Sequence, residues 1–360
     1  MTPYYQDDFV TLYHGECREI LASLRDSGES VDLVLTDPPY SRVKDDAWDR
    51  IGHADLLDLL DGVFRGVTPI MKFNAALYCF CWPNFSDRLS MLVREHFALL
   101  GHIVWCKHRP DGKLKGWVCK AGLDSLRVPF AETERIIMAE MKNSDNVADG
   151  EAHYSSQCAK TYHHTMKPLI DYFIQAKKEA GVSADEIRNR MAALTGKRYV
   201  FARHAFSFSQ WVLPTREQYE AAQTFMKIAK EGEFIGLRRE YESLRREYES
   251  LRREYESLRR EYRPKRHNFT DLWFYQPVGP GSRDRIHNCQ KPLPMLRDMI
   301  ETSCRPGGLV LDPFAGSGTT GVAAKELNRK CVLIEKEEAY CEIAARRLSQ
   351  EVFNFGEDVR

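Results

Sequence analysis

Three short, largely apolar runs predict buried β-strands, and they lie near opposite ends of the chain. The first is Val31 to Leu35, and the other two are Leu309 to Leu311 and Cys331 to Ile334. Their length and β-branched content are typical of strands buried on both faces. Between the last two runs, Thr319 to Leu327 has the spacing of an amphipathic helix. The chain therefore ends in a strand–helix–strand unit, which is typical of an α/β fold with a parallel sheet.

The middle of the chain, about residues 151 to 265, follows a helical pattern. Ser183 is a predicted N-cap, Glu186 completes a capping box, and Gly196 ends the helix. A basic, aromatic segment follows the glycine, and the three parts together outline a helix–turn–helix. The apolar stripe of the predicted helix consists of Ile187, Met191 and Leu194.

Basic residues gather in this region although the whole chain is neutral, with 52 lysines and arginines against 52 acidic residues. Any surface for an anionic polymer must therefore be local. A small helical subdomain with a solvated charged face would show the same pattern, so both interpretations stay open. The candidate phosphate contacts are Arg188, Lys197, Arg198, Arg203 and Arg216.

A seven-residue repeat runs from Leu237 to Tyr262 and alternates tyrosine and leucine at heptad a and d positions. It predicts a 26-residue helix of about 39 Å. Glutamates four residues before arginines, as in Glu242 and Arg246, add favourable pairs. Tyrosine at every a position suits a tight coiled coil poorly, because each hydroxyl needs a partner. We expect an arm packed on its own subunit, with a dimeric coiled coil as the alternative.

Composition limits the class of protein without naming it. The chain has 360 residues, 43% of them hydrophobic, which suffices for one large domain with an insertion or for two domains. Its ten cysteines include no CxxC pair, which indicates reduced thiols and no structural zinc. The start of the sequence resembles no signal peptide, and no apolar run reaches membrane-spanning length. We therefore expect a cytoplasmic protein without a metal and without a membrane partner.

The first predicted strand is followed by an acid, two prolines and an aromatic residue. Prolines keep the residue before them extended, so Asp37 and Pro38 stay open beyond the strand end. Pro39 makes the turn rigid, and Tyr40 adds an aromatic ring. An ordinary surface turn has the same residues, so this motif alone does not settle its role.

The second strand ends in a glycine turn, and an acid follows about 20 residues later. The turn is too short for a dinucleotide fingerprint, and no phosphate-binding loop is present. A nucleoside with a small charged tail fits, such as S-adenosylmethionine, with Glu335 at the ribose. Another nucleotide or a merely structural unit remains an alternative. The turn consists of Asp312, Pro313, Phe314, Ala315, Gly316, Ser317, Gly318 and Thr319.

Together, DPPY at Asp37 to Tyr40 and DPFAGSG at Asp312 to Gly318 resemble the DNA amino-methyltransferases. The order, with the catalytic motif first, resembles the permuted β class of that family. "RVKDDAWD" and "FSFSQWVLP" look most like phage- and prophage-encoded adenine methyltransferases. The resemblance also predicts two later strands of the same sheet, His102 to Lys107 and Glu132 to Glu140.

The resemblance implies further cofactor contacts. "GECREIL" lies where the family has a Gly-Asp turn at the adenine of the cofactor, and it places Glu16 and Cys17 there. "HNCQKPLPML" resembles the Gln-Lys-Pro segment that lies against the cofactor, and it places Lys291 and Pro292 there. Asp37 is expected to contact both cofactor and substrate.

The implied reaction is direct methyl transfer from S-adenosylmethionine to adenine N6 in double-stranded DNA, with site-specific or relaxed specificity. The exocyclic amine is a poor nucleophile, and acceptors at its two hydrogens would favour attack. Asp37 supplies one acceptor and the Pro38 carbonyl the other. The base must be flipped out of the duplex to reach them. The implied host is a bacterial or phage-infected cell, with a restriction–modification context and a homodimer as options.

Competing functions differ in their residue requirements. Cytosine C5 methylation needs a Pro-Cys nucleophile, which this sequence lacks. Cytosine N4 methylation uses the same fold but more often has serine in place of Asp37, so it remains the alternative. RNA and protein methyltransferases usually carry asparagine there. A catalytically silent DNA-binding protein on the same fold is the alternative from another class.

We therefore expect an α/β, Rossmann-like, doubly wound methyltransferase sheet with a mostly helical inserted region. Residues 1–150 would form the catalytic half and residues 266–360 the cofactor-binding half. Residues 151–265 would form a target-recognition insertion that ends in the heptad helix 237–262. The two halves should meet at the switch point of the sheet, which would bring Asp37 close to Gly316.

Overall fold

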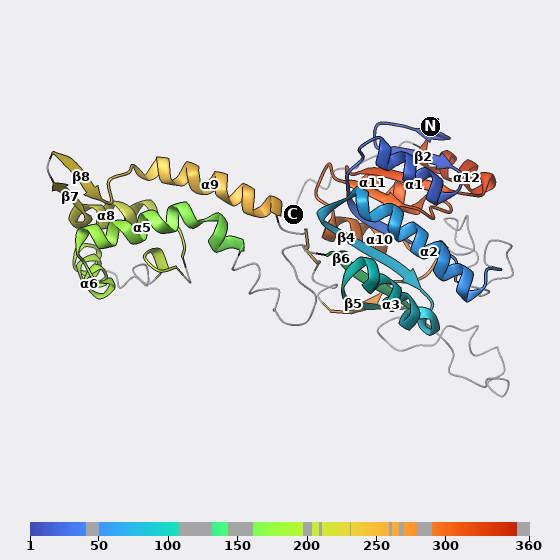
Figure 1. Ribbon diagram of the computed structural model, residues 1–360, viewed down its shortest axis with the longest axis horizontal. Helices are drawn as coiled ribbons and strands as arrows, with labels where there is room; N and C mark the ends of the chain where they lie inside the picture. The colour runs from blue at the N-terminus through green and yellow to red at the C-terminus, as the bar shows by residue number, and fades with distance from the viewer. Residues whose placement is uncertain are drawn as a thin grey trace. The chain divides into compact units, whose positions relative to one another are not determined.

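The computed structural model describes residues 1–40, 50–107, 132–142, 161–196, 204–208, 211–230, 232–258, 261–265, 270–278 and 290–350. The chain divides into two units (Figure 1). Unit 1 consists of Met1–Gly150 and Arg260–Arg360, and unit 2 is Glu151–Arg259. The "RVKDDAWD" segment lies outside the described residues, as do residues 197–203 and 287–289. In the described parts of the chain, no helix is long and apolar enough to span a membrane.

Unit 1 is built on a mixed sheet with nine strands in its described part. The pairs from β2 through β11, β10 and β3 to β4 are parallel, and β6 is antiparallel to both of its neighbours. In order across the sheet the strands are β1 (Tyr5–Gln6), β2 (Val10–His14), β11 (Lys330–Glu335), β10 (Leu309–Asp312), β3 (Val31–Thr36), β4 (Met71–Cys81), β6 (Thr133–Met141), β5 (Phe97–Cys106) and β9 (Leu272–Phe274).

The three predicted apolar runs are strands β3, β10 and β11, each within one residue of its predicted ends. The first and the last part of the chain meet in the centre of the sheet. There β10 pairs in parallel with β3, and Val310 is the register partner of Leu33. From this pair the sheet continues to β11 on one side and to β4 on the other. The predicted switch point between the two halves is therefore confirmed.

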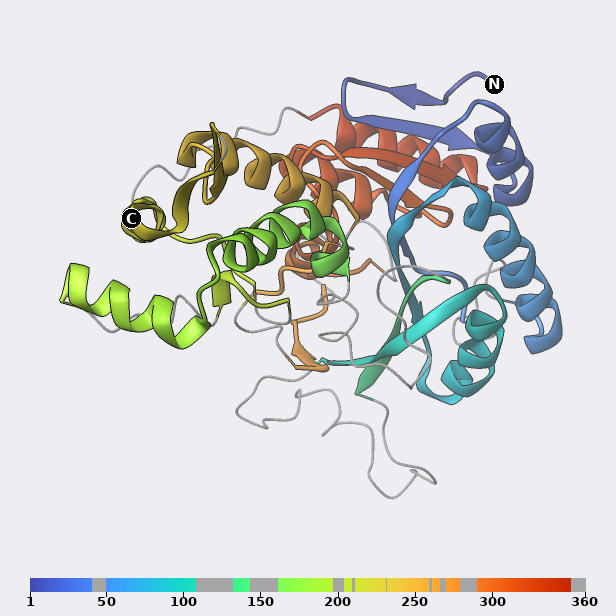
Figure 2. The ribbon, with the colours of Figure 1, turned by 60° about the vertical axis from the view of Figure 1, so that its left-hand side comes forward.

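Helices cover both faces of this sheet, which confirms the predicted α/β class (Figure 2). Neighbouring residues of β3 point to opposite faces: Val34 packs with the first helix set, and Leu33 and Leu35 pack with the second. The first set is α1 (Cys17–Asp26), α2 (His53–Val67) and α3 (Ser86–His96), with the short 3-10 helices η2 (Thr68–Ile70) and η3 (Pro83–Phe85). The second set is α10 (Leu293–Ser303), α11 (Thr319–Glu326) and α12 (Glu338–Leu348).

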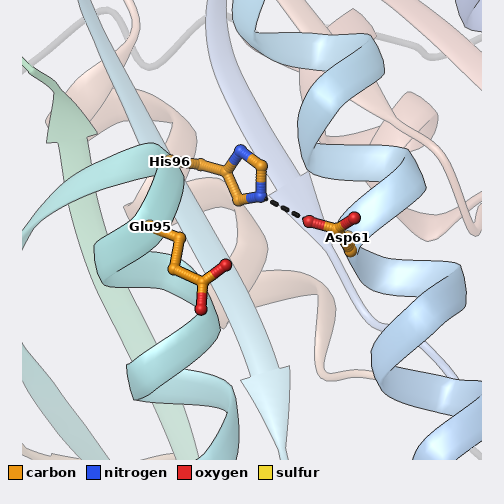
Figure 3. A group of neighbouring side chains, drawn as sticks. All are labelled: Asp61, Glu95 and His96. Carbon is orange, nitrogen blue, oxygen red and sulfur yellow. Dashed lines mark hydrogen bonds and ion pairs between the residues drawn. The ribbon is translucent and has the colours of Figure 1, made fainter.

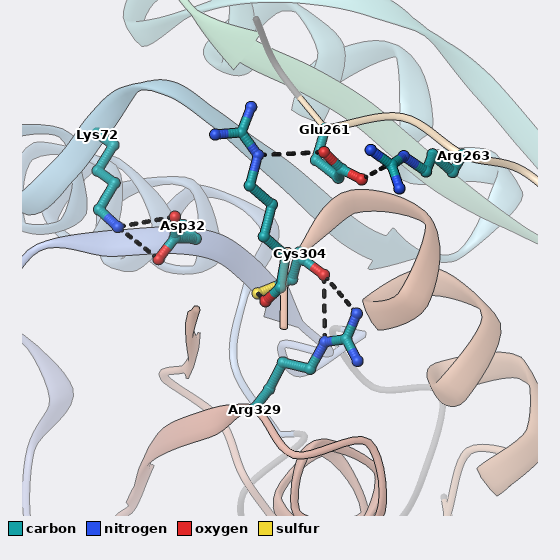
Figure 4. Close-up of polar contacts among 7 residues, drawn as sticks. Asp32, Lys72, Glu261, Arg263, Cys304 and Arg329 are labelled. Carbon is teal, nitrogen blue, oxygen red and sulfur yellow. Dashed lines mark hydrogen bonds and ion pairs between the residues drawn. The ribbon is translucent and has the colours of Figure 1, made fainter. Parts of the chain in front are cut away.

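Polar contacts join the strands at the edge where β3 and β10 begin (Figure 4). Asp32 accepts hydrogen bonds from Lys72 Nζ at 2.8 and 2.7 Å and from the Leu309 amide at 2.9 Å, which connects three strands. Nearby, Arg329 donates to the Cys304 carbonyl at 3.2 and 2.9 Å. Burial raises the pKa of the Cys304 thiol to about 12, so this cysteine is a packed apolar group.

The returning chain is anchored beside these contacts. Glu261 accepts from Arg305 Nε at 3.1 Å and pairs with Arg263 at 2.8 Å. The Arg263 amide donates to the Thr302 carbonyl at 2.8 Å. These contacts hold the segment with which the chain re-enters unit 1 on the end of α10.

Unit 2 has its own core of aromatic and aliphatic residues, including the fully buried Phe173, Trp211 and Tyr219. Within unit 2, the long helical elements are α5 (Lys167–Ala180), α6 (Ala184–Thr195), α8 (Arg216–Met226) and α9 (Tyr241–Leu258). A hairpin of β7 (Lys227–Lys230) and β8 (Glu233–Gly236) joins the last two of these.

Helix α6 begins and ends where predicted, with one correction to its cap and one to its stripe. Ser183 Oγ accepts from the Glu186 amide at 3.1 Å, and Gly196 adopts φ +68° at the end. The Glu186 carboxylate pairs with Arg190 instead of accepting from the Ser183 amide. The prediction of a full capping box is therefore wrong. Leu194 is 57% exposed and does not belong to the buried stripe.

The heptad helix is shorter than predicted. It spans 18 residues, Tyr241–Leu258, because Leu237 belongs to the end of the hairpin, where its amide donates to the Met226 carbonyl at 3.1 Å. Tyr262 lies beyond the helix in an irregular segment. In this helix Leu244 and Tyr255 are buried, and Tyr248 packs against the same core. The stripe therefore faces the core of its own unit.

The charge pairs on this helix also differ from the predicted ones. Arg246 and Arg253 donate to the backbone carbonyls of Glu242 and Glu249 at 3.3 Å each. The Glu249 carboxylate pairs with Arg245 at 3.0 Å instead. On this repeat, arginines precede and follow each glutamate, so sequence spacing alone does not decide which one pairs.

Candidate active site

Carboxylates from three strands gather at the carboxyl edge of the sheet. Asp37 follows β3, Asp312 ends β10 and Glu335 ends β11. Because β3, β10 and β11 are adjacent and parallel, their ends meet at one edge. Asp37 and Asp312 lie close enough for the charge of Asp37 to raise the pKa of Asp312. The predicted meeting of the two motifs is therefore a feature of the fold.

Asp37 is held through one of its two carboxylate oxygens. Lys291 Nζ lies 2.5 Å from Asp37 Oδ2, and Lys291 is only 7% exposed. The other oxygen, Oδ1, is buried and makes no hydrogen bond with any described residue. Burial raises the pKa of Asp37, and the charge of Glu134 adds to that rise. The Lys291 ammonium and a hydrogen bond from the Tyr40 hydroxyl oppose it. Pro38 is buried and Pro39 half-buried beside it.

Glu134 is a site residue that no sequence motif indicated. It lies near the start of β6, and because this strand is antiparallel, its start lies at the same edge as the ends of the others. Its Oε2 accepts from the Tyr40 hydroxyl at 2.8 Å, and its Oε1 lies 2.5 Å from Lys107 Nζ. Lys291 Nζ lies 3.4 Å from Glu134 Oε2. Burial alone would raise the pKa of Glu134, but Lys291 and Lys107 lower it overall.

A carboxylate near the start of a strand with an apolar centre was the signal for Glu134 in the sequence. "TERIIMAEM" contains a glutamate at each end, and an isolated buried carboxylate needs compensating charges. Its partners come from positions 40, 107 and 291, which no local pattern connects.

The cofactor strand ends in a buried acid and a tight turn. Asp312 accepts from Thr320 Oγ1 at 2.6 Å and from the Phe314 amide at 3.1 Å. Burial, together with the charges of Asp37 and Glu335, raises the pKa of Asp312 to about 7. Arg347 Nη1 donates to the Ser317 carbonyl and hydroxyl and to Thr319 Oγ1 at 2.6 to 3.1 Å, which fixes the turn from outside.

Two glycines of this turn have different roles. Gly316 adopts φ +51°, and a Cβ there would meet nothing within 4 Å, so the backbone faces open space. Gly318 adopts φ +75°, and a Cβ there would lie 2.9 Å from the Ala344 Cβ. Close contact with α12 is therefore a structural reason for glycine at position 318.

Glu335 connects the turn to the neighbouring strand end. Its Oε2 accepts from the Gly316 amide at 2.7 Å and its Oε1 from the Glu337 amide at 2.8 Å. The Lys336 amide also bonds to this carboxylate. A carboxylate offers about four acceptor positions, so about one remains for a ligand hydroxyl. Burial raises the pKa of Glu335.

Glu16 lies beside this site but has a local role. The Gly15 amide donates to the Glu335 carbonyl at 2.9 Å, which brings the two segments together. The Glu16 carboxylate caps α1 by accepting from the Arg18 amide at 2.9 Å and the Glu19 amide at 3.3 Å. Cys17 is buried, and burial raises its pKa to about 12. Pro292 is the N-cap residue of α10, directly after Lys291.

The described candidates for DNA contact lie in unit 2 and are paired. Arg188 Nη2 lies 2.8 Å from Asp185, and Arg216 pairs with Glu242. The other three, Lys197, Arg198 and Arg203, lie outside the described residues.

One group on the helices of unit 1 has side chains that could ligate a metal (Figure 3). His96 Nε2 lies 2.7 Å from Asp61 Oδ1, and Arg65 pairs with the other oxygen of Asp61 at 2.8 Å. Glu95 completes the group, whose ligand atoms lie within 4.8 Å of one another. The contacts join α2 to α3 and lie apart from the carboxylates of the strand ends.

The sheet order, its two helical layers and the acidic strand ends define a Rossmann-like α/β methyltransferase fold. The solved PvuII DNA methyltransferase (cytosine-N4-specific) shares this fold, with a TM-score of 0.52 at 13% identity over 98% of this chain and 90% of that one. Residues 31–346 match the sequence model of the N6_N4_Mtase family, described as DNA methylase. The chain belongs to this family.

Two curated relatives share a short segment with the chain. Type II methyltransferase M.HinfI of Haemophilus influenzae is 44% identical over 66 residues, 18% of each chain. Type II methyltransferase M2.DpnII of Streptococcus pneumoniae is 48% identical over 65 residues, 18% of this chain and 24% of that one. The matched segment thus spans less than a quarter of either relative.

Proposed function

We propose that the protein transfers the methyl group of S-adenosylmethionine to adenine N6 in double-stranded DNA. The observation that supports this best is the buried Asp37 Oδ1, which accepts no hydrogen bond from any residue that the structure describes. A buried acceptor without a donor raises the free energy of the folded state, and a substrate amine would supply the missing hydrogen bond. The order of the motifs supports assignment to the permuted β class, and the phage-like segments support a bacterial or phage-infected cytoplasm.

The residues at the ends of β10 and β11 fit S-adenosylmethionine. Gly316 leaves open space above its backbone, and Glu335 retains acceptor capacity for a ribose hydroxyl. The turn is long enough for an amino-acid tail and lacks a phosphate-binding loop. When bound, S-adenosylmethionine supplies a methyl group on a sulfonium sulfur, and this methyl group is readily transferred to a nitrogen nucleophile.

The chain's own residues then prepare the amine. Asp37 Oδ1 accepts one amino hydrogen and draws the nitrogen towards a tetrahedral geometry, and the Pro38 carbonyl accepts the other. The nitrogen would bond to the methyl carbon as the carbon–sulfur bond breaks, with S-adenosylhomocysteine as the leaving group. It would then give up one proton, for which Asp37 is the acceptor. Tyr40 stacks on the base and fixes the line of attack. The target base enters this site by flipping out of the duplex.

We assign DNA recognition to unit 2, where Lys197, Arg198, Arg203, Arg188 and Arg216 are the candidate phosphate contacts. Sequence-independent affinity for DNA comes mainly from such contacts. The recognition sequence itself does not follow from these residues.

Cytosine N4 is the second candidate target, because the fold relative described above is named as cytosine-N4-specific. Both reactions need an exocyclic amine and an acceptor at Asp37. Aspartate at this position favours adenine over cytosine.

The test of this function compares two aspartates of the same strand segment. Asp37→Ala should abolish transfer of labelled methyl groups to DNA while S-adenosylhomocysteine still binds, because the cofactor turn is intact. Asp32→Asn is the matched control: Asp32 lies at the opposite edge, and asparagine keeps an acceptor for the Leu309 amide. Substantial transfer by Asp37→Ala would overturn the mechanism.

A further inference from the structure

Glu134 contacts two residues that adjoin the Asp37 carboxylate, Tyr40 and Lys291, and it also pairs with Lys107. One oxygen, Oε2, receives the Tyr40 hydroxyl at 2.8 Å and lies 3.4 Å from Lys291 Nζ. The other oxygen, Oε1, lies 2.5 Å from Lys107 Nζ. The Glu134 side chain is 8% exposed, so these contacts form in a medium where charge interactions are strong.

The Lys291 ammonium is confined between two carboxylates and two aromatic rings. It lies 2.5 Å from Asp37 Oδ2 and 3.4 Å from Glu134 Oε2. The Tyr40 and Phe80 ring centroids lie 5.0 and 5.1 Å away. The attraction of this ammonium is divided between the two carboxylates. It contacts Asp37 through Oδ2, and Asp37 Oδ1 makes no hydrogen bond with a described residue.

Charge balance in the cluster supports the same interpretation. Asp37 and Glu134 carry two negative charges, and Lys291 and Lys107 carry two positive ones. Attack on the methyl group places positive charge on the amine nitrogen, and an unopposed lysine beside it would disfavour that charge. The negative charge of Glu134 offsets the positive charge of Lys291 near the reacting nitrogen.

We propose that Glu134 is a positioning residue of the methyl-transfer site: it shares Lys291 with Asp37 and holds Tyr40, so that Asp37 Oδ1 is kept open for the amino hydrogen of the base. This inference rests on the proposed function and adds a residue to it. Glu134 does not touch the base; it acts through Lys291 and Tyr40.

The pH dependence of methyl transfer distinguishes this role from a structural one. Asp37 must be ionised to accept the amino hydrogen, so the rate falls as the pH falls through its pKa. The charge of Glu134 raises that pKa and the charge of Lys291 lowers it. Within the described residues, the charged and titratable groups that interact with Asp37 include Lys291 before α10, Glu134 on β6, Tyr40, Asp312 at the end of β10, and Cys79 and Cys81 on β4.

The experiment measures single-turnover methyl transfer to DNA against pH for the full-length chain and three variants. Glu134→Gln should lower the maximal rate about tenfold or more, since small displacements at a reacting centre are costly. Its acid limb should move to lower pH, whereas that of Lys291→Met should move to higher pH. Affinity for S-adenosylhomocysteine should stay unchanged in Glu134→Gln.

Glu140→Gln is the matched control, because Glu140 is a buried glutamate at the other end of the same strand. Its profile should coincide with that of the wild type. An active wild type whose Glu134→Gln variant keeps the original rate or acid limb overturns this inference alone. A wild type that transfers no methyl group to DNA overturns the proposed function and this inference with it.

Discussion

At the scale of single residues, chemistry-bearing positions that follow a strand could be predicted, and their partners could not. Asp37 and Glu335 could be proposed from the sequence because ligands of parallel α/β sheets bind beyond the carboxyl ends of the strands. Glu134 and Lys107 were missed because their roles come from contacts between strands that are distant in sequence. The resemblance placed Glu16 at the adenine of the cofactor, and the structure adds that its carboxylate caps α1.

Gly316 and Gly318 offer a prediction at this scale. An alanine at either position adopts a left-handed backbone, which costs about 1–2 kcal/mol. Gly318→Ala also drives its Cβ against Ala344, so it should cost about 2–4 kcal/mol in all, as overpacking does. Urea unfolding of the full chain measures the difference. S-adenosylhomocysteine titration should show the opposite order, with the larger loss of affinity in Gly316→Ala. Equal unfolding midpoints for the two variants would contradict the packing role of Gly318.

At the scale of elements, apolar runs and caps predicted strands β3, β10 and β11 and both ends of α6 to within about a residue. Periodicity alone did not place the start of α9. The repeat continues through Leu237, but backbone pairing with Met226 holds that residue in the hairpin. A heptad pattern indicates which face is apolar, and tertiary hydrogen bonds decide where the helix begins.

The repeat also provides its own controls for the role of α9. Leu244 is fully buried in the core of unit 2, while Leu251, one heptad later, is only partly buried. Leu244→Ala should therefore destabilise the protein by about 2–5 kcal/mol. Leu251→Ala should cost about 1 kcal/mol, since it removes less buried apolar area. Thermal unfolding and mass in solution measure both effects. Equal destabilisation accompanied by dissociation of a dimer would favour the coiled coil instead.

At the scale of the whole molecule, the chain has no net charge, and the question is which of its basic residues are already paired with acids. The described arginines of α6 and α8 are paired with neighbouring acids, as in Arg188 with Asp185. Composition predicted that any DNA-binding surface is local, and it could not show which basic side chains are already paired. That depends on helix geometry and on contacts between helices.

The salt dependence of DNA binding tests the local surface. Replacing Lys197, Arg198 and Arg203 by alanine should weaken binding and flatten its dependence on salt by about 0.9 for each phosphate that is no longer neutralised. The charge-matched control replaces three exposed, ion-paired arginines in the last turns of helices of unit 1: Arg25, Arg65 and Arg346. Helices in a βα unit end at the edge opposite the strand ends, so the control should keep the original slope. An identical slope change in both triple variants would place the DNA surface elsewhere.

The most direct test is mass spectrometry of nucleosides from double-stranded DNA incubated with the full chain and methyl-labelled S-adenosylmethionine. If Asp37 holds the amino group of adenine, the wild type should yield labelled N6-methyladenine. The Asp37→Ala variant should yield none. Labelled N4-methylcytosine in its place would contradict the choice of base. Label in no nucleoside, or on cytosine C5, would contradict the account of this site as an amino-methyltransferase.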